Sequence, residues 1–150
     1  MQDIFRWLKE DPQLDFNFLA DLTAVDYLDK RTPRFEVVYH LYSLSKNHRL
    51  RVKIPVAGED PVVDSLTPLW KGANWLEREV WDMFGIRFRG HPDLRRILLY
   101  EQFEGYPLRK DYPVNYRQPL VKERELEGTF VDSRSDDKLA QLKQKLAPKS

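Results

Sequence analysis

The chain has 150 residues, of which 41% are hydrophobic and 33% charged, a balance typical of one folded, water-soluble domain with a short appendage. It contains no cysteine, which excludes disulfides, zinc–thiolate sites, cysteine-ligated iron–sulfur clusters and cysteine nucleophiles. The 25 basic and 24 acidic residues give a net charge of +1, so the sequence provides no overall field for capturing nucleic acid or anionic lipid.

The first third of the chain predicts one helix and three strands. Residues 1–10 have an amphipathic helical pattern, which Pro12 ends. Residues 16–28 and 35–44 are dense in apolar, β-branched and aromatic side chains on either side of a polar turn, which predicts a hairpin. Residues 50–54 alternate apolar with basic side chains, so we expect a third, half-buried strand.

Nothing in this sequence predicts a segment that enters a membrane. Nowhere do about 18 apolar residues follow one another, and the first residues lack an apolar stretch of signal-peptide length. We therefore expect a cytoplasmic location, with membrane association only through a partner.

The middle of the chain predicts a loop and a second helix. Residues 55–68 contain three prolines and indicate a connecting loop. A helix over 75–84 follows, with Asn74 as its cap, Glu77 completing a capping box and Gly85 ending it. Its predicted buried stripe consists of Leu76, Val80, Met83 and Phe84.

The predicted second helix also carries a charged face and leads into an extended segment. Arg78 and Asp82 lie four residues apart, which predicts an ion pair along the helix. Residues 86–89 alternate apolar side chains with arginine and predict a short fourth strand, which the turn-like residues 90–93 close.

Beyond residue 100 the pattern changes. Prolines and tyrosines recur without a period of 2 or 3.6, so this segment is either loose or ordered by lying on another protein. Leu139, Leu142 and Leu146 predict a short terminal helix that is marginal without a partner. We divide the chain into a domain, residues 1–100, and an extended C-terminal arm, residues 101–150.

The predicted fold class is α+β. The elements favour a two-layer domain with a mixed sheet of three to five strands, two helices packed mainly on one face, and the extended arm.

Residues 77–98 concentrate the side chains that could carry chemistry, and three interpretations compete. A metal or hydrolytic site could use Glu79, Asp82 and His91, but neither an HExxH nor a Glu-x-x-His spacing is present. A nucleic-acid surface is the second interpretation. Six basic residues between 85 and 113 are accompanied by four acidic ones, however, which favours paired charges over a phosphate track.

The third interpretation is structural. The acidic helix and the arginines after it would form a network that pins the arm to the domain and to a neighbouring protein. Arginine suits this role because its planar guanidinium pairs bidentately with carboxylates and stacks on aromatic rings.

Taken as a whole, the sequence resembles the 30 kDa, or C, subunit family of respiratory complex I. The resemblance rests on EREVWDMFGIRFRGHPDLRRIL at 77–98 and GYPLRKDYP at 105–113, with FNFLAD at 16–21 and DYL at 26–28 before them. It covers about residues 16–113. Family members usually have more residues before the FNFLAD segment, often with a first strand, and the likeness fades after Pro113.

This resemblance implies a subunit without cofactor in the peripheral arm of a proton-translocating NADH:quinone oxidoreductase. The subunit would dock against the 49 kDa-type subunit near the Fe–S subunits, on the cytoplasmic side of the bacterial inner membrane. NADH, FMN, Fe–S clusters and quinone would belong to the rest of the complex, and no nucleic acid would be bound. Relatives also serve F420H2 dehydrogenases and membrane-bound hydrogenases, so the electron donor stays open.

The resemblance and the charge pattern together give a set of expected structural and interface residues, and none with a catalytic, cofactor-binding or metal-binding role. Glu77, Glu79 and Asp82 should pair with arginines of residues 87–96 or with the partner, while residues 105–113 are clamped between subunits. The full set is Glu77, Arg78, Glu79, Asp82, His91, Pro92, Arg95, Arg96, Pro107, Arg109, Lys110, Asp111, Tyr112 and Pro113.

Overall fold

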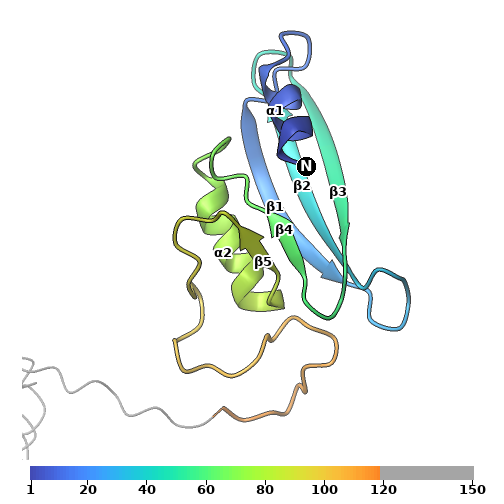
Figure 1. Cartoon of the computed structure of the whole chain (residues 1–150), viewed down its shortest axis with the longest axis vertical. Coiled ribbons are helices and arrows are strands. Elements are labelled where there is room, and N and C mark those ends of the chain that lie inside the picture. Colours follow the sequence, from blue (N-terminus) through green and yellow to red (C-terminus); the bar gives the residue numbers. More distant parts are fainter. Residues whose placement is uncertain (119–150) are drawn as a thin grey trace, which may run out of the picture. The chain divides into compact units, whose positions relative to one another are not determined.

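The computed structural model describes residues 1–118, which form an α+β domain with two helices, as predicted (Figure 1). Their elements, in chain order, are α1 (Gln2–Glu10), β1 (Phe18–Asp26), β2 (Phe35–Ser43), β3 (His48–Val56), β4 (Val62–Asp64), α2 (Ala73–Phe84) and β5 (Arg87–Arg89).

The strands divide into two sheets rather than the single mixed sheet that the sequence suggested. Strands β1, β2 and β3 form an antiparallel meander in chain order, with an irregular register between Leu19 and Asp21. Strands β4 and β5 form a separate two-stranded parallel sheet. Strand β4 lies inside residues 55–68, which the sequence predicted to be a loop. The sequence does not predict this strand because three residues are too few to show a recognisable alternation.

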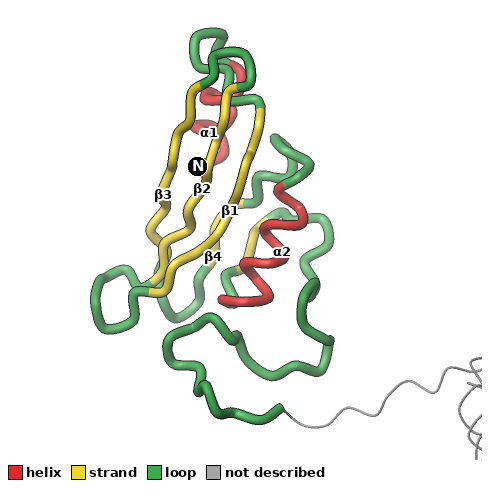
Figure 2. Tube along the Cα trace, turned by 180° about the vertical axis from the view of Figure 1, so that it is seen from behind, coloured by secondary structure: helices red, strands yellow, loops and turns green. Residues whose placement is uncertain are grey.

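One hydrophobic core joins the three-stranded sheet to both helices. The inner face of the sheet includes Leu22, Val37 and Tyr39, and the ring of Phe5 from α1 lies 4.8 Å from that of Tyr39. Helix α2 adds Val80 and other apolar side chains to the same cluster. Viewed from the opposite side, the sheet lies in front of α1, and no described helix covers its outer face (Figure 2).

Helix α2 begins differently from the prediction and ends as predicted. Its N-cap is Gly72, and no side chain caps it, so the capping box of Asn74 and Glu77 is wrong. At its end, Gly85 adopts a φ of 72° and donates its N–H to the carbonyl of Trp81. A Cβ at Gly85 would lie 2.6 Å from side-chain atoms of Tyr106 and Arg109. Glycine is therefore required both by the positive φ and by the lack of space for a side chain.

Residues 101–118 contain no helix or strand, yet they do not leave the domain. Residues 95–112, called the strap below, run back along α2 and the end of the hairpin and hydrogen-bond to both. A chain without periodicity is thus ordered here by its own domain. The division at residue 100 stays a prediction, and the terminal helix predicted around 139–146 lies outside the described residues.

Candidate functional site

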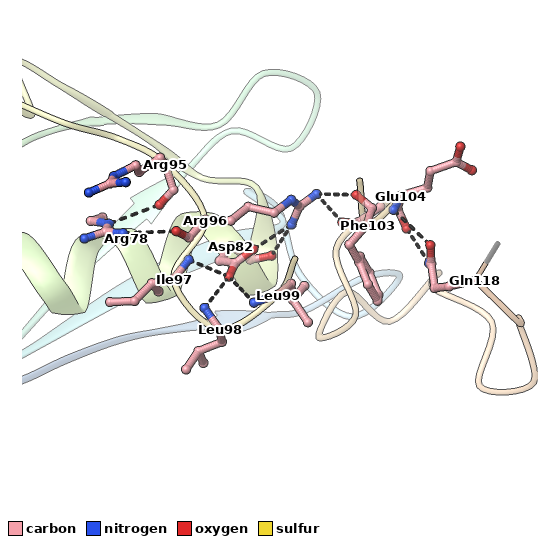
Figure 3. A network of polar contacts seen from close by, with 11 residues as sticks. Arg78, Asp82, Arg95, Arg96, Ile97, Leu98, Leu99, Phe103, Glu104 and Gln118 are labelled. Atoms are coloured by element: carbon pink, nitrogen blue, oxygen red, sulfur yellow. Dashed lines mark hydrogen bonds and ion pairs between the residues drawn. The ribbon is translucent and has the colours of Figure 1, made fainter. Parts of the chain in front are cut away.

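The side chain of Asp82 organises the start of the strap. Asp82 is fully buried, and its Oδ2 accepts the backbone N–H groups of Ile97, Leu98 and Leu99 at 3.0, 2.9 and 2.9 Å (Figure 3). Three consecutive amides therefore converge on one carboxylate oxygen from α2, which fixes the turn of the strap at these residues.

Arg96 completes this network, as the predicted pairing with the acidic helix requires. Its Nη1 donates to Asp82 Oδ1 at 2.6 Å, while its Nη2 donates to the carbonyls of Phe103 and Gly105 at 2.8 and 3.2 Å (Figure 3). The guanidinium also lies within 5.8 Å of the ring centroids of Trp81, Phe103 and Tyr106. One arginine thus links α2 to two separate stretches of the strap.

These contacts keep Asp82 ionised. Burial alone would raise the pKa of Asp82, but the Leu99 amide, the Arg96 guanidinium and the other two amides outweigh it and hold that pKa below its ordinary value. The charge is therefore compensated inside the protein instead of by water.

A second buried aspartate, Asp26 at the end of β1, holds the far part of the strap. Arg34 pairs with it bidentately, Nε to Oδ1 at 2.8 Å and Nη2 to Oδ2 at 2.7 Å, and the Lys110 amide donates to Oδ2 at 2.8 Å. The same guanidinium bonds Asp111 at 2.9 and 3.0 Å. Burial opposes ionisation, but Arg34 and the amides of Lys110 and Leu28 lower the pKa of Asp26 to about 2.

Sequence reasoning missed Asp26 and Arg34 as a site. The available signal was an acid at the last position of an apolar strand, with an arginine just across the hairpin turn. Because Asp26 and Arg34 lie far from the acidic helix in sequence, nothing linked them to the strap.

The C-terminal end of α2 is covered by the strap itself. The Leu108 amide donates to the Met83 carbonyl at 3.1 Å, and Arg109 Nε donates to the Phe84 carbonyl at 2.5 Å. The last carbonyls of a helix have no hydrogen-bond donor within the helix, and here the strap provides the donors.

The predicted ion pair between Arg78 and Asp82 is wrong. Arg78 instead donates to the carbonyls of Arg95 and Arg96 at 3.1 and 3.0 Å, while Asp82 turns toward the strap. Spacing along a helix identifies possible partners within the helix, but it cannot reveal a strap that binds both side chains.

Glu77 does not pair with an arginine, contrary to prediction. It is fully buried and accepts the hydroxyl of Ser65 at 2.7 Å and the amide of Leu66 at 2.6 Å. Burial raises the pKa of Glu77 to about 7, and these two hydrogen bonds oppose the shift only partly. The carboxyl therefore keeps its proton to a higher pH than a solvent-exposed glutamate does.

The remaining predicted residues lie around this network on the surface or at its margin. Glu79 is exposed and makes no hydrogen bond or ion pair among residues 1–118. His91 Nε2 contacts the Asn74 carbonyl at 3.2 Å, and Arg95 pairs with Asp93 at 2.9 Å.

The prolines and Tyr112 complete the predicted set. The ring of Tyr112 stacks at 6.2 Å on that of Phe103, and its hydroxyl accepts a bond from Gln118 at 2.6 Å. Pro92 and Pro113 are exposed, and Pro107 is half-buried.

Two further observations concern the described part of the chain. Residues 1–118 hold no group of three or more His, Asp and Glu side chains arranged as metal ligands, and the Glu79, Asp82 and His91 of the metal hypothesis have the separate surroundings given above. No described helix has the length and apolar character needed to span a bilayer.

The fold and the site define a small α+β domain in which two buried aspartates and two arginines hold a C-terminal strap. The family model described as "Respiratory-chain NADH dehydrogenase, 30 Kd subunit" matches residues 1–118. The chain belongs to this family.

Individual relatives agree with this assignment. The C 2 subunit of the NADH-quinone oxidoreductase of Rhizobium meliloti (strain 1021) is 58% identical over 116 residues, which cover 77% of this chain and 63% of the relative. The C subunit of the Geobacter sulfurreducens enzyme is 54% identical over 112 residues, covering 75% and 68%. This chain thus spans less than two thirds of the first of these relatives.

A solved structure is also similar. It is described as "Nqo5 of the trypsin-resistant fragment (1-134) in P63 form", and it matches with a TM-score of 0.55 and 45% sequence identity. The match covers 62% of this chain and 77% of that one, and it supports the α+β fold.

Proposed function

We propose that this chain is a structural subunit in the peripheral arm of a membrane-bound NADH:quinone oxidoreductase. It docks against the 49 kDa-type subunit, near the Fe–S subunits, and supports electron transfer from NADH to quinone without binding a cofactor itself. Family membership supports the assembly, and the anchored strap is the observation that carries the docking role.

The strap has the properties of a pre-organised docking element. Buried charges fix its backbone, yet Leu98, Tyr100 and Leu108 leave 62%, 42% and 51% of their surface exposed. Exposed apolar side chains on a fixed backbone lose little conformational entropy when a partner covers them. Aromatic and aliphatic anchors of this kind are typical of the centres of protein interfaces.

The composition supports a role without redox chemistry of its own. These 150 residues contain no cysteine, so none of them ligates a cluster through a cysteine thiolate. The arginines that suggested a nucleic-acid surface are largely committed: Arg87, Arg89, Arg95 and Arg96 each pair with a carboxylate.

Affinity purification tests the assembly. The full chain is tagged in its host, membranes are solubilised in mild detergent, and co-purifying proteins are identified by mass. The expected result is co-purification with Fe–S subunits and a 49 kDa-type subunit, with NADH:quinone reductase activity in the same fraction. Activity with hydrogen or reduced F420 instead of NADH would contradict the proposed donor, and purification of the chain alone would contradict the assembly.

Charge reversal tests the strap. Arg96→Glu places an acid beside Asp82, so the strap should detach and the chain should be lost from the complex. The matched control is Arg6→Glu, because Arg6 is exposed on α1, away from the strap, and its pair with Asp3 contributes at most about 1 kcal/mol to folding. Full assembly of the Arg96→Glu variant would contradict the proposed docking role of the strap.

A further inference from the structure

The outer face of the β1–β2–β3 sheet carries a hollow of about 640 Å³. No described helix lies over this face of the sheet (Figure 2). Apolar and aromatic side chains form part of its lining, and basic side chains from β2 and β3 form the rest. The main side chains are Phe18, Tyr42 and Leu44 on the apolar side and His40, Arg49 and Arg51 on the basic side.

The two arginines of this hollow differ from most arginines of the domain. Seven others each have a carboxylate within 4.0 Å, namely Arg6, Arg31, Arg34, Arg87, Arg89, Arg95 and Arg96. Within residues 1–118, neither Arg49 nor Arg51 has a carboxylate partner or a side-chain hydrogen bond. The Arg49 guanidinium lies over the Tyr42 ring, 5.2 Å from its centre.

The nearest acidic side chains do not neutralise these arginines. Asp21 is opposite His40, and His40 is opposite Arg51, so Asp21 and Arg51 are two strands apart, a separation of about 10 Å. Glu36 is buried on the same face, but Arg31 and Lys53 already pair with it. The positive charge of Arg49 and Arg51 is therefore available to a ligand.

The apolar part of the hollow is also available. Phe18 exposes 47% of its surface and Leu44 exposes 64%. Strand β3, which carries both arginines, is an edge strand of the sheet, and neither view shows a described element along the side of β3 that faces away from β2 (Figures 1 and 2). An apolar surface next to unpaired charge and an open edge has the features of a binding site for an extended peptide.

We propose that this hollow binds an extended acidic segment of a neighbouring subunit, with two carboxylates on alternate residues and an apolar side chain beside them. Arg49 and Arg51 are two residues apart on one face of a strand, a separation of about 6.6 Å. Alternate side chains of an extended peptide have the same repeat, so both carboxylates meet a guanidinium together. This inference rests on the proposed function, and the hollow is a second contact on the face opposite the helices.

The chemistry favours this occupant over two others. In a two-fold contact between copies of this chain, the same patch would meet itself, which would bring the arginines of one copy against those of the other. A nucleic acid would need a longer basic track, whereas here the two arginines border apolar side chains and the acidic Asp21 lies on the same sheet, opposite His40.

Photo-crosslinking in the assembled complex tests the site. A photoreactive phenylalanine replaces Leu44 in the tagged full chain, and in a matched sample it replaces Lys30, which is exposed in the β1–β2 turn. The complex is irradiated and purified, and crosslinked peptides are identified by mass. The expected result is a crosslink from position 44 into an acidic segment of another subunit, with a yield at least about 10-fold above that from position 30.

Charge variants then test the role of the arginines. Arg49→Glu combined with Arg51→Glu should lower the crosslink yield from position 44 at least about 10-fold, while Arg49→Lys with Arg51→Lys should keep part of it. All four substitutions are at exposed positions, and thermal melting of the isolated chain checks that folding is unchanged.

Several outcomes overturn the inference. A crosslink to a second copy of this chain, a crosslink to lipid, or no crosslink from a chain that has entered the complex refutes the acidic segment and leaves the proposed function standing. A tagged chain that does not enter the complex at all overturns both.

Discussion

Two carboxylates of the same helix, Asp82 and Glu77, show how surroundings rather than burial decide charge. Both side chains are fully buried on α2. Asp82 meets an arginine and three amides, which hold its pKa below the ordinary value despite burial. Glu77 meets one hydroxyl and one amide, which are too few to offset burial, and its pKa rises to about 7. One carboxylate fastens the strap, and the other is an ionisable group inside the core.

The largest effect should come from Asp82→Ala, which leaves Arg96 and three part-buried backbone amides without their carboxylate acceptor. Removing one partner of a buried ion pair typically costs about 3–5 kcal/mol. We expect a loss of that size in the free energy of unfolding, measured by urea denaturation. Asp82→Asn keeps one acceptor oxygen and should lose less. A loss below about 1 kcal/mol in the alanine variant would show that the strap does not depend on Asp82.

Glu77→Gln should raise the free energy of unfolding instead of lowering it, and only at higher pH. The folded-state pKa of about 7 exceeds the ordinary value of 4.5, so stability from this group is fully present below pH 4.5 and is lost as pH rises through 7. The difference amounts to about 3 kcal/mol. Glutamine mimics the protonated acid, so the variant should match the wild type near pH 4.5 and be more stable at pH 8.

Unfolding curves from pH 4.5 to 8 measure the effect of Glu77→Gln. The control is Glu79→Gln, an exposed position on the same helix, which should leave the pH profile unchanged. Parallel profiles for the wild type and Glu77→Gln would mean that Glu77 titrates normally.

Asp26→Asn extends the comparison to a second buried aspartate whose pKa is lowered, as that of Asp82 is. The pKa of Asp26 is lowered from 3.8 to about 2, so its stabilisation is present above pH 3.8 and is lost as pH falls through 2. We expect the variant to lose about 2 kcal/mol at pH 7 and little near pH 2. Acid titration followed by circular dichroism measures this, and equal acid midpoints for variant and wild type would refute it.

The smallest effect should come from Arg78→Gln, because Arg78 binds two strap carbonyls from a half-buried position. A loss of about 1 kcal/mol is expected, consistent with hydrogen bonds that water can partly replace. Amide hydrogen exchange at Ile97 and Leu98 should quicken by a smaller factor than in Asp82→Asn. A larger loss than in that variant would reverse the assigned order of the two contacts.

The sequence predicted the parts of the fold that repeat a pattern. The amphipathic helix, the hairpin and the alternating third strand were found because each shows its own period over several residues. Strand β4 has only three residues, and its partner β5 follows α2 in the chain. No local sequence pattern therefore marks β4 as a strand. The capping box failed because Glu77 serves the core instead of the helix end.

The site was predicted only in part. The pairing of the acidic helix with an arginine of residues 87–96 is confirmed for Asp82 and Arg96, since charge and residue type suggested it. The partners of Arg78, Glu77 and Asp26 depend on where the strap and Ser65 lie in three dimensions, which spacing along the chain does not reveal.

Carbon-13 NMR titration of the side-chain carboxyls in the full chain tests the contrast between Asp82 and Glu77 most directly. Both groups are observed in one sample from pH 2 to 9, with Asp82→Asn and Glu77→Gln providing the assignments. The expected result is a pKa near 7 for Glu77 and one below 3.8 for Asp82. Ordinary pKa values for both carboxyls, or a higher pKa for Asp82 than for Glu77, would contradict the account.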